Sequence, residues 1–86
     1  MTIQDFIAGL NAKFAGHNYT FSLEPGRKFT RVVSTSYGSR SAFCFIDAEG
    51  NIYKTASWKA PAKGIRATLA TLDLSRVDQH GGWLYR

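Results

Sequence analysis

A chain of 86 residues is long enough for one small domain with a modest hydrophobic core. Its apolar fraction of 44% and charged fraction of 20% are those of a globular protein and exclude an intrinsically disordered chain. Eleven Lys and Arg residues against six acids give a net charge of +5. This excess favours anionic partners: nucleic acid, an anionic membrane or an acidic protein surface.

The cysteine content and the first residues exclude further classes. Cys44 is the only cysteine, which rules out an internal disulfide and a multi-cysteine zinc site. Residues 1–10 have neither a basic segment nor a long apolar run, so they predict no signal peptide and no membrane span. We therefore expect a cytoplasmic protein that does not bind a membrane.

The first segment predicts an amphipathic helix that ends at Gly16. Apolar residues recur at spacings of three and four and would form one stripe: Ile3, Phe6, Ile7, Leu10 and Phe14. Thr2 is expected to cap the N-terminus of this helix, because Asp5 follows three residues later. Gly16 accepts the left-handed conformation with which many helices end.

Four short segments then predict strands joined by tight turns. Their β-branched and aromatic content, and the Gly, Pro, Asn and Asp residues between them, are typical of hairpins. We expect strands at residues 19–23, 28–35, 41–47 and 52–56. Gly50 is expected to adopt the left-handed conformation in the last of the turns.

Residues 61–72 predict a second amphipathic helix. Pro61 suits its first turn, whereas Gly64 would weaken it slightly. Its core stripe would be Ala62, Ile65, Leu69 and Leu72. The predicted fold is α+β with two layers: a four-stranded antiparallel meander with an N-terminal and a C-terminal helix packed on one face (α-β-β-β-β-α), in a single domain over residues 1–86. After a turn at His80, residues 83–85 could add an edge strand.

A basic ridge is the first candidate for a functional surface. Lys59, Lys63 and Arg66 have the spacing i, i+4, i+7, so a helix reaching back to Lys59 would line them along one face. Three further cations on the sheet could extend this ridge: Arg31, Arg40 and Lys54. Such a ridge can bind phosphates without reading sequence. The alternative is a solvated helix face that only keeps the protein soluble.

Aromatic side chains are the second candidate. Trp58 precedes Lys59 and suits base stacking or a cation–π contact, although a role in packing the seam between strand and helix is commoner. The sheet aromatics could form a stacking platform, but Phe43 and Phe45 are expected in the core. Tyr37 falls in a turn and is the aromatic that we expect to be exposed.

Catalysis and bound cofactors or metals are not expected. His17 and His80 are far apart in the sequence, and both fall in predicted turns. Cys44 lies in the middle of a strand, where a small buried thiol is the norm. No glycine-rich phosphate loop follows a strand, and the residues from Asp47 to Asn51 lack the spacing of a calcium loop.

A sequence pattern links the centre of the chain to a known group of proteins. Residues 45–66 contain F-x-D, then G-x-x-x-K-x-A-S-W-K-x-P-A-K-x-x-R, which begins at Gly50 and ends at Arg66. This segment resembles small uncharacterised proteins of tailed bacteriophages. The resemblance covers about residues 43–66 and implies a phage product in a bacterial cytoplasm, but no mechanism. The predicted element order is also similar to that of a double-stranded-RNA-binding domain, except for the fourth strand.

Three hypotheses follow. The first is a non-enzymatic nucleic-acid-binding module, with phosphate contacts from Lys54, Lys59, Lys63 and Arg66, support from Arg31 and Arg40, and stacking on Trp58 or Tyr37. The second is a host-takeover or inhibitor protein that docks on an acidic bacterial protein. The third is a homodimer that pairs through a sheet edge or through residues 83–85.

Overall fold

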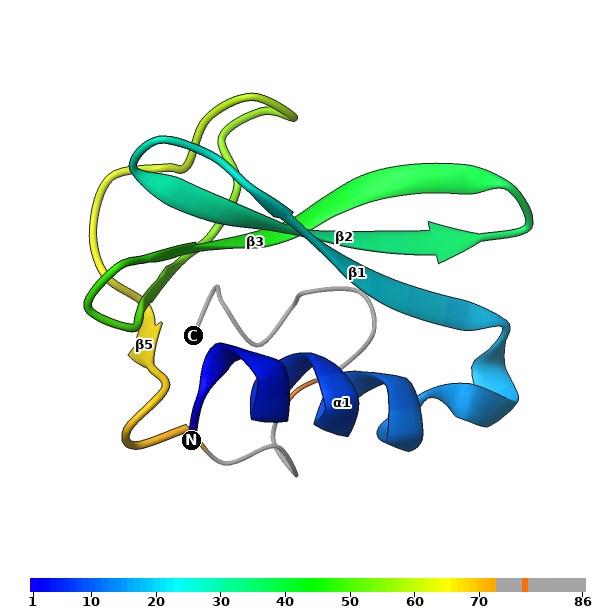
Figure 1. The fold of residues 1–86 in the computed structure, drawn as a ribbon. Coiled ribbons are helices and arrows are strands. Elements are labelled where there is room, and N and C mark those ends of the chain that lie inside the picture. The colour runs from blue at the N-terminus through cyan, green and yellow to red at the C-terminus, as the bar shows by residue number, and fades with distance from the viewer. Residues whose placement is uncertain (73–76, 78–86) are drawn as a thin grey trace.

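The computed structural model describes residues 1–72 and Val77. Its elements are α1 (Ile3–Lys13), a 3-10 turn η1 (Ala15–His17), β1 (Tyr19–Pro25), β2 (Phe29–Ser36), β3 (Ser39–Asp47), β4 (Asn51–Tyr53) and β5 (Ala67–Thr68). The strands form one antiparallel sheet in the order β1-β2-β3-β4-β5, and α1 lies along one face of it (Figure 1). The α+β class is therefore confirmed.

The N-terminal helix begins as its sequence predicts. The Asp5 backbone N–H donates to Thr2 Oγ1 at 3.0 Å, and the Thr2 N–H donates to Asp5 Oδ2 at 3.0 Å, which completes a capping box. The predicted end of the helix at Gly16 is wrong. The helix gives way to the 3-10 turn, and the left-handed residue is Asn18, with φ 61°. Asparagine tolerates this conformation because its short polar side chain bonds locally.

The main core lies between α1 and the face of the sheet that we call the inner face. It consists of the following residues: Phe6, Leu10, Phe14, Phe21, Val32, Phe43, Cys44, Ile46, Ile52, Leu69 and Val77. A β-bulge in β3 lets two consecutive residues, Phe43 and Cys44, belong to this core. At the bulge Val32 pairs with Cys44 and Val33 pairs with Ala42, so Phe43 has no partner in the pairing. Burial raises the pKa of the Cys44 thiol, as expected for a structural cysteine.

The open edge of β1 is covered at its centre by a side chain of α1. The Asn11 amide donates from Nδ2 to the Phe21 carbonyl oxygen at 2.9 Å, and its Oδ1 accepts from the Phe21 N–H at 2.7 Å. The amide thus replaces the two backbone bonds that a neighbouring strand would form there. Exposed strand edges invite pairing with other chains, and this contact removes the two central groups from that role.

The β2–β3 hairpin turns at Tyr37 and Gly38, both with positive φ (52° and 81°), as in a type I′ turn. Tyr37 is 86% exposed, which confirms the expected exposure. Its phenol oxygen accepts a hydrogen bond of 2.7 Å from Asn18 Nδ2. The left-handed conformation expected at Gly50 is also confirmed, with φ +86°.

The second helix is the main error of the sequence-based prediction. The chain from Pro61 to Leu72 contains no helix; it follows β4 and forms β5. Three of its N–H groups bond to alternate carbonyls of β4 and the residues next to it: Ala62 to Lys54, Arg66 to Ile52, and Leu69 to Gly50, each at 2.8 Å. These groups are unavailable for a helical ladder, so tertiary bonding overrides the local apolar spacing.

The absence of this helix changes several dependent predictions. Ile65, expected in the core, is 54% exposed, whereas Leu69 is buried as expected. The sheet has a fifth strand in place of the helix, so the similarity to a double-stranded-RNA-binding domain is not supported. The turn at His80 and the edge strand at 83–85 lie outside the described residues.

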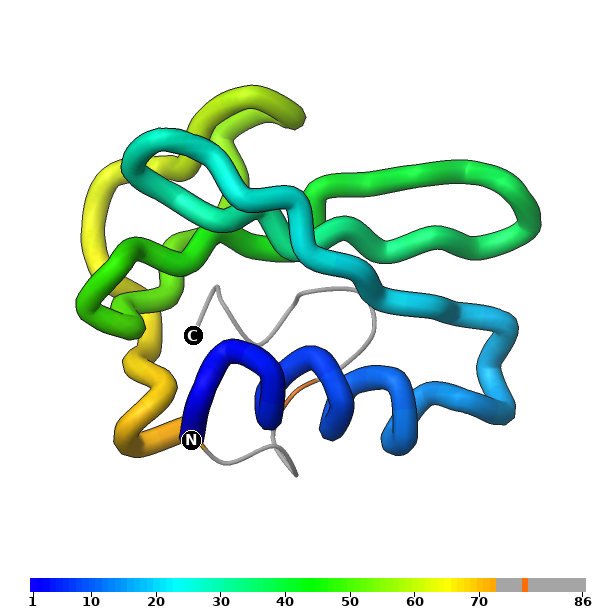
Figure 2. The backbone as a smooth tube through the Cα atoms, in the orientation of Figure 1, coloured from blue at the N-terminus to red at the C-terminus, as the bar shows by residue number. Residues whose placement is uncertain are grey.

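Residues 54–66 form the second cover of the sheet. The tube in Figure 2 shows this segment leaving β4, arching above the strands on the side opposite α1, and descending to β5. The sheet therefore has the helix on its inner face and an irregular loop over its other face, which we call the outer face.

Replacing Gly64 with Ala distinguishes the observed loop from the predicted helix. Gly64 has φ +94°, so Gly64→Ala should lower the free energy of unfolding by about 1–2 kcal/mol. In a helix the same change would raise it by about 1 kcal/mol. Gly16→Ala is the matched control: its φ is not positive and no atom lies within 4 Å of the added Cβ. Urea denaturation measures both, and a stabilised Gly64→Ala protein would contradict the loop.

Removal of the edge-covering amide should also be measurable. Asn11→Ala breaks two hydrogen bonds to the part-buried Phe21 backbone and should cost about 1–2 kcal/mol of unfolding free energy. Gln4→Ala, at an exposed position of the same helix, gains similar helix propensity without losing such bonds and should stay within about 0.5 kcal/mol of the parent. Equal effects in chemical denaturation would show that the amide does not support the edge.

Candidate functional site

A row of four side chains crosses the outer face of the sheet. Strand pairing aligns Glu24 of β1 with Arg31 of β2, Arg31 with Phe45 of β3, and Phe45 with Tyr53 of β4. The Phe29 ring packs edge-on against Phe45 and Tyr53, with centroids 6.3 and 5.3 Å apart. Phe45 is only 3% exposed, although it lies outside the main core. One end of the outer face therefore carries the rings of Phe29, Phe45 and Tyr53, which we call the aromatic floor. The other end carries the ion pair between Glu24 and Arg31.

The Asp47 carboxylate fixes the hairpin beside this floor. Oδ1 accepts the backbone N–H groups of Glu49 and Asn51 at 3.0 and 2.9 Å, and Oδ2 accepts Asn51 Nδ2 and the Tyr53 hydroxyl at 3.0 and 2.9 Å. Burial raises the pKa of Asp47, but these hydrogen bonds outweigh it and the pKa is lowered. Donation to Asp47 raises the pKa of the Tyr53 phenol. Asp47 thus has a structural role, because its bonding capacity is used within the fold.

A tight turn places Trp58 and Lys59 above the outer face. The Ala60 carbonyl accepts the N–H groups of Ala56 and Ser57 at 3.0 and 3.1 Å, and the Ala60 N–H returns to the Ser57 carbonyl at 3.4 Å. The Lys59 N–H also bonds Ser57 Oγ at 3.3 Å. Trp58 and Lys59 are therefore the two central residues of the turn.

Trp58 contacts two guanidinium groups of the sheet. Arg31 Cζ lies 4.4 Å from the centroid of its ring and Arg40 Cζ lies 5.3 Å from it. Both arginines pair with one carboxylate: Arg31 Nη1 donates to Glu24 Oε1 at 2.9 Å, and Arg40 bonds Oε2. The bond from Arg40, followed by that from Arg31, holds the pKa of Glu24 below its usual value, although burial opposes the shift. Packing on arginine, rather than in a seam between strand and helix, is the role that the structure shows for Trp58.

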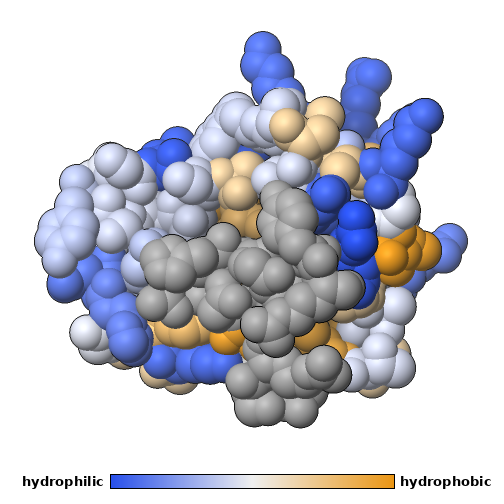
Figure 3. All heavy atoms as spheres, turned by 180° about the vertical axis from the view of Figure 1, so that it is seen from behind, coloured by the Kyte–Doolittle hydropathy of each residue, from blue (hydrophilic) through white to orange (hydrophobic). Residues whose placement is uncertain are grey.

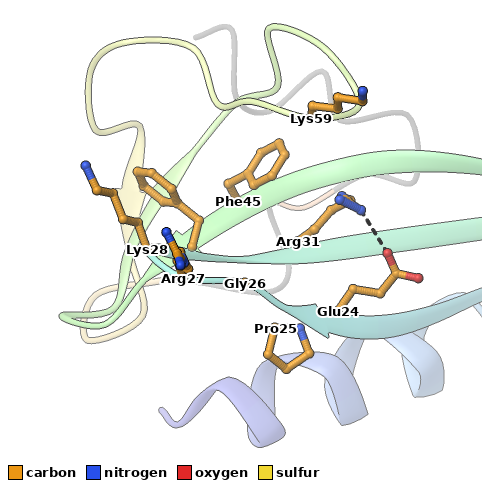
Figure 4. A pocket seen from close by; sticks show the side chains of 9 residues that line it. Glu24, Pro25, Gly26, Arg27, Lys28, Arg31, Phe45 and Lys59 are labelled. Carbon is orange, nitrogen blue, oxygen red and sulfur yellow. Dashed lines mark hydrogen bonds and ion pairs between the residues drawn. The ribbon is translucent and has the colours of Figure 1, made fainter.

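A groove of about 440 Å³ opens beside this stack (Figure 4). We call it the basic groove, and its lining residues are Glu24, Pro25, Gly26, Arg27, Lys28, Phe29, Arg31, Phe45 and Lys59. Four of them are cations, and they come from three segments: the β1–β2 turn, β2 and the turn after β4. Figure 4 shows Lys59 on one side of Phe45, and Arg27 and Lys28 on the other. The one acid in the lining, Glu24, is already paired.

The structure brings together half of the residues predicted for the site. Arg31, Arg40, Trp58 and Lys59 meet on the outer face. Lys63 and Arg66 are exposed on the returning segment and do not line the groove, so the predicted helical ridge is wrong. Lys54 is half-buried, and Tyr37 lies at the tip of the β2–β3 hairpin.

Sequence reasoning missed three contributors to the groove. The sequence pattern places Glu24 and Arg27 in the turn between the first two predicted strands, and Lys28 at the start of the second strand. The available signal was two adjacent cations beside a Pro-Gly turn, which marks a solvent-exposed hairpin end but not what lies opposite it. The space-filling view shows strongly hydrophilic side chains projecting from the side of the molecule on which residues 54–66 lie (Figure 3).

The part of the chain that the structure describes offers no other kind of site of two common classes. Within it, no group of three His, Cys, Asp or Glu side chains could hold a metal ion. Across residues 1–72 and Val77, no helix has the length and apolar character needed to cross a membrane.

The fold and the groove together define a small α+β protein with a cationic, aromatic-floored sheet face. The chain belongs to a family of unknown function (DUF7717), whose family model matches residues 4–86. No curated protein and no solved structure matches the chain. The resemblance to tailed-phage proteins stays a prediction.

The ion pairs of Glu24 predict a pH-dependent stability. Because the pKa of Glu24 in the folded protein lies below the ordinary value of 4.5, its contribution is fully present above about pH 4.5 and is lost as the pH falls through the lowered pKa. The parent should be more stable than Glu24→Gln above about pH 4.5, and the two should converge in acid. Thermal unfolding of both proteins across this range tests it, and a difference independent of pH would contradict it.

Proposed function

We propose that this protein is a non-enzymatic nucleic-acid-binding module whose phosphate-binding surface is the basic groove. The observation that carries this proposal is the convergence of Arg27, Lys28, Arg31 and Lys59 on one groove. Three segments of the chain supply them, so the tertiary fold brings these charges together. The single carboxylate of the lining is neutralised by two arginines.

The exposed members of the groove are suited to phosphate contacts. Arg27, Lys28 and Lys59 are exposed, and none of them forms an ion pair within the described residues. Each cation that neutralises a phosphate releases condensed counterions, which strengthens binding at low salt. With about three such contacts, the logarithm of the binding constant should fall with the logarithm of the salt concentration with a slope of roughly −2 to −3. Arg31 is committed to Glu24 and acts mainly through its charge.

An acidic bacterial protein surface is the second candidate partner. Its support is the exposed apolar area of the segment after β4: Ile65 is 54% and Trp58 38% exposed, and phosphate binding does not require an exposed isoleucine. Trp and Arg are also common at the energetic centres of protein interfaces. Pairing of two copies through the β1 edge has less support, because Asn11 occupies the central groups of that edge.

Fluorescence anisotropy with labelled single-stranded DNA, duplex DNA and RNA, at low and near-physiological salt, tests the first candidate. Lys59→Ala, Arg27→Ala and Lys28→Ala should each weaken binding and reduce the salt slope by about 1. The matched controls are Lys63→Ala and Arg66→Ala, which remove the same charge from exposed positions outside the groove. They should change affinity much less.

Two results would contradict the groove as the binding surface. Equal effects of groove and control variants would mean that net charge alone drives association. Absence of binding at low salt would remove nucleic acid as the partner, and a pull-down from nuclease-treated bacterial lysate would then address the acidic protein.

A further inference from the structure

Part of the Trp58 ring is open to solvent although two arginines contact it. Arg31 and Arg40 bond to the two oxygens of the same Glu24 carboxylate, so their guanidinium groups lie next to each other. Both arginines extend from the sheet to the ring, and Trp58 is still 38% exposed, so part of its ring is open to solvent.

The stack beneath the ring restricts its movement. Glu24 and Arg31 are paired neighbours on β1 and β2, and Arg40 reaches the same carboxylate from β3. Above them, the turn from Ser57 to Ala60 is closed by backbone bonds. Trp58 is therefore restrained by its contacts with Arg31 and Arg40 and by the hydrogen bonds of its own turn. It is not part of the main apolar core. A ring held in this way is pre-organised for stacking and loses little entropy when a planar group covers it.

The arrangement of Arg31 also argues against a purely structural purpose. Its Nε atom is buried and has no hydrogen-bond partner among the described residues. An unpaired buried donor is unfavourable for folding, and such groups call for an explanation. One explanation is that Arg31 is held close to the Trp58 ring, with Cζ 4.4 Å from the centroid, in a position where Nη1 bonds to Glu24 and Nε does not.

We infer that the ligand of the basic groove is single-stranded nucleic acid, with phosphates on Arg27, Lys28 and Lys59 and one unpaired base stacked on the exposed part of the Trp58 ring. This inference rests on the proposed function. Lys59 follows Trp58 directly and lines the groove, so the stacking surface and the phosphate surface are adjacent. Stacking on aromatic side chains tolerates any base sequence, because every base has a π-face. In a duplex the bases are stacked and paired, so a lone indole gains no such contact without unstacking them.

The test compares ligands that carry the same phosphates but different bases. Fluorescence anisotropy at low salt is measured with an oligothymidylate of about twelve nucleotides, its abasic analogue, an oligouridylate and a duplex of equal length. The parent should bind the oligothymidylate about five- to 100-fold more tightly than the abasic strand. Because this comparison uses the unmodified protein, it does not depend on how a variant folds. The oligouridylate distinguishes RNA from DNA as the source of the unpaired base.

Variants of Trp58 locate the effect. Trp58→Leu should lose most of the preference for the base-bearing strand while keeping its affinity for the abasic strand and the duplex. Trp58→Tyr keeps an aromatic face and should restore part of the preference. Thermal unfolding of each variant confirms that it is folded, and retained abasic-strand binding confirms that the groove is intact.

The outcomes separate this inference from the function on which it rests. Salt-sensitive binding without preference between base-bearing strand, abasic strand and duplex overturns the single-stranded inference and leaves the phosphate-binding function standing. A preference that Trp58→Leu does not reduce also overturns it, because stacking then occurs elsewhere. Absence of binding to all four ligands at low salt overturns both, and points to the acidic protein partner.

Discussion

The pairing of β2 with β3 is the constraint on which the rest of this structure depends. Along part of their length these two strands are buried on both faces, since the consecutive residues Val32 and Val33 are buried in β2, as are Cys44, Phe45 and Ile46 in β3. A sheet buried on both sides needs two covering layers. Of these two faces, α1 covers only the inner one (Figure 1). The second layer comes from the segment after β4, which is too short and too polar to build another apolar core.

The composition of this second layer explains why the outer face is cationic. Its cover is one tryptophan at the tip of a turn, and the side chains beneath it are two arginines. Arginine can lie beneath a ring because its guanidinium is planar and weakly hydrated. Two cations at such close range need a counter-charge, and Glu24 provides it for both. The packing of this face therefore depends on charge, whereas that of the inner face depends on apolar area.

The same arrangement links stability to the proposed function. Glu24 satisfies Arg31 and Arg40, so the remaining cations of the groove, Arg27, Lys28 and Lys59, stay available to an outside anion. A polyanion that enters the groove would meet exposed cations beside the rings of Phe29 and Phe45. Membership of a family of unknown function adds no constraint on the ligand. The chemistry of the groove alone indicates an anionic ligand.

The sequence by itself determined the elements that depend on neighbours along the chain. The capping box of α1 and the positive φ at Gly50 both arise from contacts within a few residues. Such contacts are read directly from residue type and spacing. The same reasoning correctly assigned Phe43, Phe45 and Cys44 to buried positions.

Only the tertiary structure decided the path of residues 54–69 and the composition of the site. The apolar spacing of Ala62, Ile65 and Leu69 fits a helix. Carbonyls of β4 and the residues next to it nevertheless accept hydrogen bonds from backbone N–H groups of this segment, including those of Arg66 and Leu69, which a helix would use internally. Because the segment is not helical, Lys63 and Arg66 do not share a face with Lys59. Its path also folds Trp58 back onto Arg31, and places Lys59 opposite a β1–β2 turn some thirty residues earlier in the chain. Contacts between distant segments depend on strand register and backbone bonding, which residue spacing along one segment does not encode.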